Sequence, residues 1–82
     1  MKQVLYFSAP WCGPCVSLKP RLEPLRNQMR IVDINVDSSP ETAQQWRVRN
    51  VPTIIITNGT DEVGRLVGSA ITPEAITNLF NR

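Results

Sequence analysis

The sequence predicts an α/β fold from three observations. The chain has 82 residues, below the usual domain size of roughly 100 to 150, so we expect one domain over residues 1–82. Two strand-like segments, Gln3–Ser8 and Arg30–Val36, flank a helical pattern of the length that parallel strands require between them. Asn58-Gly59 separates two further strand-like segments, which is a strong signal for an antiparallel hairpin. The expected element order is β-α-β-α-β-β-α.

The segment between the first two strands predicts an amphipathic helix from Gly13 to about Met29. Its apolar residues recur at spacings near three or four: Val16, Leu18, Leu22, Leu25 and Met29. Pro14 suits the first helical turn, where a missing N–H costs nothing. Pro20 and Pro24 each remove a backbone hydrogen bond further along. We therefore expect this helix to kink or to end early.

The second half of the chain predicts a short helix, a hairpin and a last helix. Ser39 is the expected N-cap of the short helix, which reaches about Val48. Thr53–Thr57 and Glu62–Val67 carry the β-branched and apolar residues of the two hairpin strands. Thr72, followed by a proline and an acidic residue, is the expected N-cap of the last helix.

Charge and hydropathy argue against two classes of partner. The formal net charge is +2, and the nine Lys and Arg residues are scattered along the chain, so a nucleic-acid interface is not predicted. The first apolar segment, Val4–Phe7, is too short for the core of a signal peptide and far too short to span a membrane. We therefore expect a cytoplasmic protein that acts without nucleic acid or membrane.

Cys12 and Cys15 are the only cysteines, and such a pair has three common uses. As a structural staple the pair is weak, because a bridge across so short a loop removes little entropy from the unfolded chain. A structural zinc site typically needs about four N or S ligands, and the chain has no His, so only a cluster shared between chains stays open. No metal site is predicted. The position between a strand and a helix favours the third use, thiol–disulfide exchange.

The spacing of the two cysteines assigns them different roles in such an exchange. Cys12 is expected at the start of the helix, with its sulfur facing solvent and unpaired N–H groups that stabilise a thiolate, so it is the predicted nucleophile. Cys15 lies about one helical turn further and is placed to resolve a mixed disulfide on Cys12. Gly13 leaves the approach open, and Pro14 stiffens the turn.

The run Trp11-Cys12-Gly13-Pro14-Cys15 resembles the active site of the thioredoxin family. Pro20 stands where that family has a helix-kinking proline, and Asn35-x-Asp37, Val51-Pro52-Thr53, Asn58-Gly59 and Gly68 follow in the family's order at nearly its spacing. The resemblance covers essentially the whole chain. It implies a thioredoxin-like fold with a four-stranded mixed sheet in the order 2-1-3-4 and three helices. It also implies a protein-disulfide reductase whose only redox group is the Cys12–Cys15 pair, with no other cofactor.

The resemblance further implies how partners bind. Pro52 should follow a cis peptide bond and lie against the cysteines, while Val51 offers backbone groups to an extended substrate. Trp11, Val51, Pro52 and Gly68 would form the docking surface beside Gly13 and Pro14. The expected partners are protein disulfides and a thioredoxin reductase or similar electron donor, and the expected state is a monomer.

Two departures from the family pattern stand out. Thioredoxins generally carry an extra strand and helix before the strand that leads to the active site, whereas here that strand begins almost at Met1. The family also buries an acid six residues before the nucleophile, and that position here is Tyr6. We hypothesise that Asp33, on the adjacent predicted strand, accepts the Cys15 proton instead. The simpler interpretation of Asp33 is a solvated or paired carboxylate.

Two rival functions remain at this point. The first is a glutaredoxin-like reductase driven by glutathione, which the identity of the electron donor would distinguish. The second is a binding module that uses the same surface as a clamp, with the cysteines incidental. A Cys12→Ser variant that kept full biological activity would favour the binding module.

Overall fold

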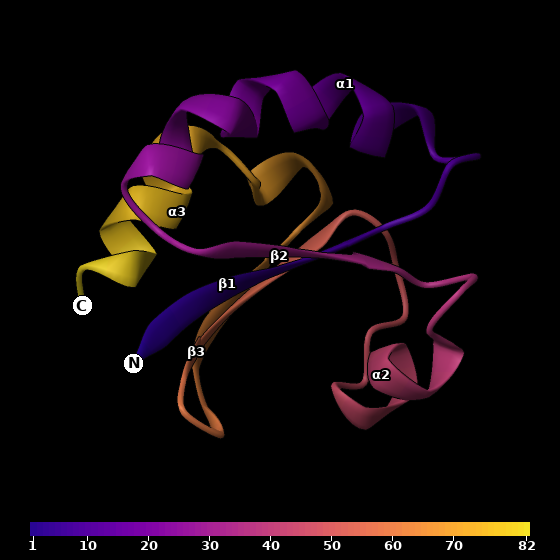
Figure 1. The fold of residues 1–82 in the computed structure, drawn as a ribbon. Helices are drawn as coiled ribbons and strands as arrows, with labels where there is room; N and C mark the ends of the chain where they lie inside the picture. The colour runs from indigo at the N-terminus through magenta and orange to yellow at the C-terminus, as the bar shows by residue number, and fades with distance from the viewer.

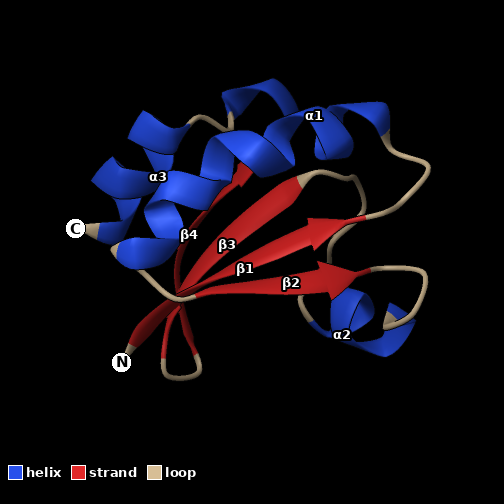
Figure 2. Cartoon of the chain, turned by 45° about the horizontal axis from the view of Figure 1, so that its top comes forward, coloured by secondary structure: helices blue, strands red, loops and turns tan.

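One mixed sheet is built from four strands: β1 (Lys2–Ser8), β2 (Ile31–Asn35), β3 (Thr53–Asn58) and β4 (Asp61–Val67). The computed structural model (Figure 1) describes residues 1–82 and places the strands in the order β2-β1-β3-β4 (Figure 2). β1 is parallel to β2 and antiparallel to β3, and β3 is antiparallel to β4. The predicted sheet order is therefore confirmed.

Three α-helices cover the two faces of this sheet: α1 (Gly13–Leu22), α2 (Pro40–Gln45) and α3 (Pro73–Phe80). α1 and α3 lie on one face and α2 on the other (Figure 2). No helix is both long and apolar enough to cross a membrane.

The central strand β1 is buried on both faces, which explains its continuous apolar run. Val4 and Tyr6 pack in a cluster of 11 buried residues with α1 and α3. Leu5 and Phe7 point to the opposite face and pack with Ala43 of α2 in a smaller cluster of 4. The β1 terminus that precedes the cysteines is thus held by packing from both sides.

The first helix ends early, as its prolines predict. α1 stops at Leu22, and a 3₁₀ segment, Glu23–Asn27, continues the chain with Pro24 in its first turn. The assignment of Val16 to the apolar, buried face of the helix was wrong, because Val16 is 59% exposed. Cys15 and Leu18 face the sheet, and one residue turns a helix by about 100°, which carries Val16 to the solvent side.

The second helix is shorter than predicted. It ends at Gln45 rather than near Val48, and Arg47 adopts a left-handed conformation with φ of 56° that stops the helix. Ser39 holds the N-cap position, but its side chain makes no capping hydrogen bond. The last helix follows the prediction, since the Thr72 hydroxyl accepts a hydrogen bond from the Ala75 N–H at 3.0 Å.

Candidate active site

The two cysteines lie where the chain passes from β1 into α1, and their sulfurs form a disulfide. Cys12 is the N-cap of α1 and Cys15 lies in its first turn. Cys12 is only 5% exposed and Cys15 only 3%. Cys12 therefore presents much less surface to solvent than the sequence suggested, because Ala9, Val36 and Val51 pack around the pair.

The backbone of α1 favours negative charge on Cys12. The Cys15 N–H donates a hydrogen bond to Cys12 Sγ at 3.2 Å, so the sulfur takes the place of a capping oxygen. The first turn of α1 contains no acidic residue that would offset the positive end of the helix dipole. This environment is the kind that stabilises a thiolate once the disulfide is reduced.

The peptide bond between Val51 and Pro52 is cis, as the sequence resemblance implied. Val51 packs against the cluster of Ala9, Cys12 and Cys15, and the next residue, Pro52, is buried. Neither the N–H nor the carbonyl of Val51 has a hydrogen-bond partner within the chain. Both groups are therefore free to pair with an extended peptide that approaches the disulfide.

A groove of about 520 Å³ runs between α1 and the loop that carries the cis proline. It brings together four residues that the sequence resemblance assigned to substrate binding: Pro14, Val51, Pro52 and Gly68. Gly68 has a φ of +60° and its N–H donates to the Pro52 carbonyl at 3.0 Å. Glycine is favoured there by this left-handed backbone conformation.

The remaining two predicted binding residues lie outside that groove. Trp11 is 69% exposed and lines a separate hollow of about 290 Å³ with Val51, while Gly13 is exposed at the start of α1. The Trp11 indole N–H donates to Asp37 Oδ2 at 2.9 Å. Asn35 Oδ1 in turn accepts the Asp37 N–H at 2.8 Å.

Sequence reasoning gave no individual role to Asn35 and Asp37, although it noted their motif. The structure shows what they do, since Asp37 holds the indole of Trp11, the residue before Cys12, and Asn35 in turn holds the backbone of Asp37. The available signal was the position of this motif at the end of β2, the strand that lies beside β1, which leads to the cysteines.

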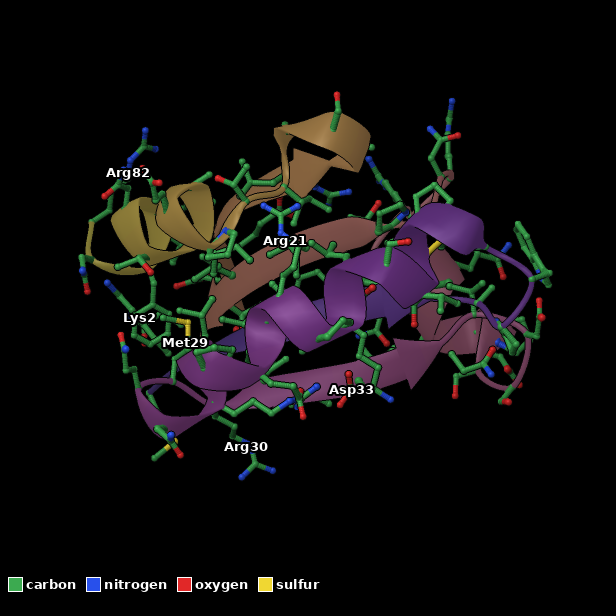
Figure 3. The ribbon with its side chains drawn as sticks, turned by 90° about the horizontal axis from the view of Figure 1, so that it is seen from above. Lys2, Arg21, Met29, Arg30, Asp33 and Arg82 are labelled. Carbon is green, nitrogen blue, oxygen red and sulfur yellow. A yellow bond between two sulfur atoms is a disulfide. The ribbon has the colours of Figure 1, made fainter.

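Tyr6, Cys15 and Asp33 meet at a hollow of about 310 Å³ on the other side of α1. Tyr6 and Asp33 are partners in the register of β1 and β2, and Figure 3 shows Asp33 on β2 alongside α1. The Tyr6 hydroxyl donates to the Cys15 carbonyl at 2.8 Å, which ties the first turn of α1 to the sheet. Asp33 Oδ1 accepts from Arg26 Nη2 at 3.0 Å, so it is a paired carboxylate within reach of the same hollow.

The electrostatics of this hollow separate the roles of Tyr6 and Asp33. Burial raises the pKa of the Tyr6 phenol, and the nearby Asp33 carboxylate raises it further. Tyr6 therefore stays protonated near neutral pH and acts as a hydrogen-bond donor rather than a base. Asp33 is the one carboxylate that lines the hollow. No group of three or more His, Cys, Asp or Glu side chains gathers to hold a metal ion.

A family model described as thioredoxin matches residues 1–82. The chain belongs to the thioredoxin family. A thioredoxin of Chlamydia trachomatis is 43% identical over 65 residues, which make up 76% of this chain and 64% of that protein. A bifunctional thioredoxin reductase/thioredoxin of Mycobacterium leprae is 40% identical over 67 residues, 77% of this chain and 15% of that protein. The chain thus spans less than two thirds of the length of either thioredoxin relative.

The solved structures agree with the family assignment. A mutant thioredoxin from Halobacterium salinarum superposes with a TM-score of 0.88 at 32% identity, over 98% of this chain and 72% of that chain. The thioredoxin-like fold that the sequence implied is confirmed.

Proposed function

We propose that this chain is a thiol–disulfide oxidoreductase that reduces protein disulfides through Cys12 and Cys15. The observation that carries the proposal is the position of the disulfide: it caps the N-terminus of α1 next to the unpaired backbone of Val51. Such an exchange requires two parts. One is a sulfur that the end of a helix activates, and the other is a stretch of unpaired backbone that can hold an extended peptide.

The reaction starts from the reduced dithiol and proceeds by two exchanges. The Cys12 thiolate attacks one sulfur of the substrate disulfide, which breaks the substrate S–S bond and forms a mixed disulfide, and the released substrate thiolate takes a proton. Cys15 then loses its proton, and its thiolate attacks Cys12 Sγ. The second substrate sulfur leaves and takes a proton, so two electrons and two protons pass to the substrate and the Cys12–Cys15 disulfide forms.

Asp33 is the proposed acceptor of the Cys15 proton. Its carboxylate lines the hollow that Cys15 also lines, and Tyr6, which stands between them on β1, is kept protonated. Proton transfer through this hollow needs a bridging water, because Asp33 makes no direct hydrogen bond to Cys15. Asp33 thus supplies from the edge strand the base that Tyr6 cannot supply.

The dithiol must be restored by an electron donor. The relative from Mycobacterium leprae is named a bifunctional thioredoxin reductase/thioredoxin, which supports a thioredoxin reductase as the donor here. We further propose that the chain works as a monomer in the cytoplasm, since a reducing compartment keeps such a pair available as a dithiol.

Insulin reduction tests the proposed activity. The wild-type chain with NADPH and a thioredoxin reductase should reduce insulin disulfides, Cys12→Ser should abolish turnover, and the distant Arg30→Gln should leave it unchanged. Inactivity of the wild type with this reductase and with dithiothreitol would refute the proposal. Turnover with glutathione and glutathione reductase alone would instead assign a glutaredoxin-like activity.

Asp33→Asn tests the proton acceptor. We expect resolution of a preformed Cys12 mixed disulfide to slow by about tenfold or more, since positioned bases typically contribute at least about 100-fold. Its dependence on pH should also shift. The rates and pH profile should not change in Asp61→Asn, a carboxylate change at the far hairpin.

A second variant separates proton transfer from structure. Arg26→Gln removes the ion pair with Asp33 but keeps the carboxylate, so it should retain most of the resolution rate. Equal slowing in Arg26→Gln and Asp33→Asn would mean that only the ion pair matters, and an unchanged Asp33→Asn profile would exclude Asp33 altogether.

A further inference from the structure

The groove between α1 and the cis-proline loop carries a single charged side chain. Arg21, in the last turn of α1, lines it together with apolar and hydroxyl side chains and with the backbone of Val51 and Gly68. No acidic residue lines this groove. Figure 3 shows Arg21 between α1 and the C-terminal segment that leads into α3.

Arg21 has no carboxylate partner within the chain. Glu23, the acid nearest to it in sequence, is paired with Arg26, and Arg26 also binds Asp33. Arg21 takes part in none of the ion pairs or side-chain hydrogen bonds of the structure, and it is exposed. An exposed cation that is alone in a docking groove favours a partner of opposite charge.

Each of the two other hollows near the active site also carries a cation that forms no ion pair. Lys19 lines the hollow beside Cys15, and Arg49 lines the hollow beside Trp11. Neither cation forms an ion pair. Asp33 is paired with Arg26, whereas Asp37 accepts only from the uncharged Trp11 indole and keeps its negative charge. Each of the three hollows therefore carries one cation without an ion pair, although the net charge is only +2, and only the groove of Arg21 is free of nearby carboxylates in its lining and contacts.

We propose that Arg21 makes this chain select acidic substrates: a disulfide-bearing peptide lies in the groove, and one of its carboxylates pairs with the Arg21 guanidinium. The inference rests on the proposed reductase function and adds the substrate class to it. Arg21 follows Cys12 by nine residues, or about 13 Å of helix at 1.5 Å per residue. About four extended peptide residues span that distance, so the carboxylate belongs about four residues from the attacked cysteine.

The test uses three disulfide peptides that differ only in having Glu, Gln or Lys at four residues from the attacked cysteine. The wild-type dithiol should reduce the Glu peptide about two- to fivefold faster, in kcat/KM at low salt, than the Gln peptide, as an exposed ion pair allows. The Lys peptide should be slower still. The differences should shrink at high salt, because exposed charges are screened.

Two variants and one control identify the residue responsible. Arg21→Gln should abolish the preference, and Arg21→Glu should reverse it in favour of the Lys peptide. Arg30→Glu makes the same change in net charge on an exposed residue away from the groove (Figure 3) and should leave the preference intact. Thermal melting of each variant checks that it folds. The preference of the wild type and its salt dependence are measured without any variant, so they test the proposal even if a variant fails to fold.

The outcomes separate the two proposals. A wild type that reduces none of the peptides overturns the reductase function and the inference together. Equal reduction of the three peptides overturns only the acidic preference, and so does a preference that Arg21→Glu leaves unchanged. Oxidised glutathione, which carries its own carboxylates, is tested in parallel. If Arg21→Glu slows only its reduction, the groove serves glutathione and the peptide assignment is wrong.

Discussion

At the scale of single residues, Thr57 carries the one buried side-chain polar atom that lacks a hydrogen-bond partner. It lies on β3, one of the two inner strands, is 1% exposed, and its hydroxyl has no hydrogen-bond partner. A buried polar group without a partner costs about 1 to 3 kcal/mol, whereas an apolar group of the same shape carries no such cost. Thr57→Val should therefore raise the free energy of unfolding by about 1 kcal/mol in urea titrations.

Thr53 on the same strand provides a matched control. It is 2% exposed, but its hydroxyl donates to the Asn50 carbonyl at 2.6 Å. Thr53→Val removes this bond and leaves the carbonyl without its donor, so it should lower stability by about 1 kcal/mol. Equal effects of the two substitutions would show that valine acts through its strand preference alone.

Sequence patterns point most directly to residues whose predicted role depends on their immediate neighbours. Cys12, Cys15 and Pro52 stand in short motifs, and the structure brings their elements together beside one groove. The bond from the Tyr6 hydroxyl to the Cys15 carbonyl was not foreseen, because strand alternation tells which face a side chain occupies and not which atom it meets. Arg21 could not be singled out from the sequence either, because no local pattern distinguishes it from any other exposed cation on a helix.

At the scale of elements, Arg65 joins β4 to the end of α2. Its guanidinium donates to the Trp46 carbonyl at 2.9 Å and to Glu62 Oε1 at 2.7 Å. The hydrogen bond from Arg65 lowers the pKa of the Glu62 carboxyl below its ordinary value of 4.5. Because the folded state binds this proton less readily than the unfolded state, the pair stabilises the fold above pH 4.5, and that contribution is lost as the pH falls.

In Glu62→Gln, the free energy of unfolding should accordingly fall less steeply as the pH is lowered. The variant should lose up to about 1 kcal/mol at neutral pH, the range for a partly exposed pair, and the difference from the wild type should shrink as the pH falls below 4.5. Urea titrations between pH 3 and 7 measure this, with Asp61→Asn on the same strand as control. Parallel profiles for wild type and Glu62→Gln would show that the pair contributes nothing that depends on pH.

The helix boundaries show where prediction from local pattern stops. The two prolines after the active site correctly indicated an early end to α1, because a missing N–H is a local property. The end of α2 was placed too late, since the apolar pattern continues through Trp46 and Val48. Those side chains pack against the sheet from an irregular segment, so burial continues after the helix has ended.

At the scale of the whole molecule, the sheet order followed from chain connectivity together with the family resemblance. A βαβ unit fixes β1 beside β2, the Asn58-Gly59 turn fixes β3 beside β4, and the resemblance joins the two halves through β1 and β3. The unequal cores, 11 buried residues on the face of α1 and α3 against 4 on the face of α2, were not predicted. They depend on how the helices sit on a twisted sheet, which no local pattern specifies.

The larger core, and not the disulfide, should hold the molecule together. A chain of 82 residues has a free energy of unfolding of about 4 to 12 kcal/mol at 0.05 to 0.15 kcal/mol per residue. The Cys12–Cys15 bridge spans a sequence separation of 3, and a loop that short contributes about 2 kcal/mol on the chain-entropy model. Truncation of Ile76, which is 0% exposed in the larger core, costs about 2 to 5 kcal/mol.

Reduction of the disulfide should therefore leave the chain folded at 25 °C with a lower melting temperature, and Ile76→Ala should destabilise it more than reduction does. Circular dichroism melts with and without a phosphine reductant measure both effects, and Cys12→Ser serves as a control that reductant leaves unchanged. Unfolding on reduction would assign the pair to structure rather than exchange. A stable dithiol form is what the proposed function demands, because the Cys12 sulfur must still cap the N-terminus of α1, by accepting from the Cys15 N–H, after the disulfide has opened.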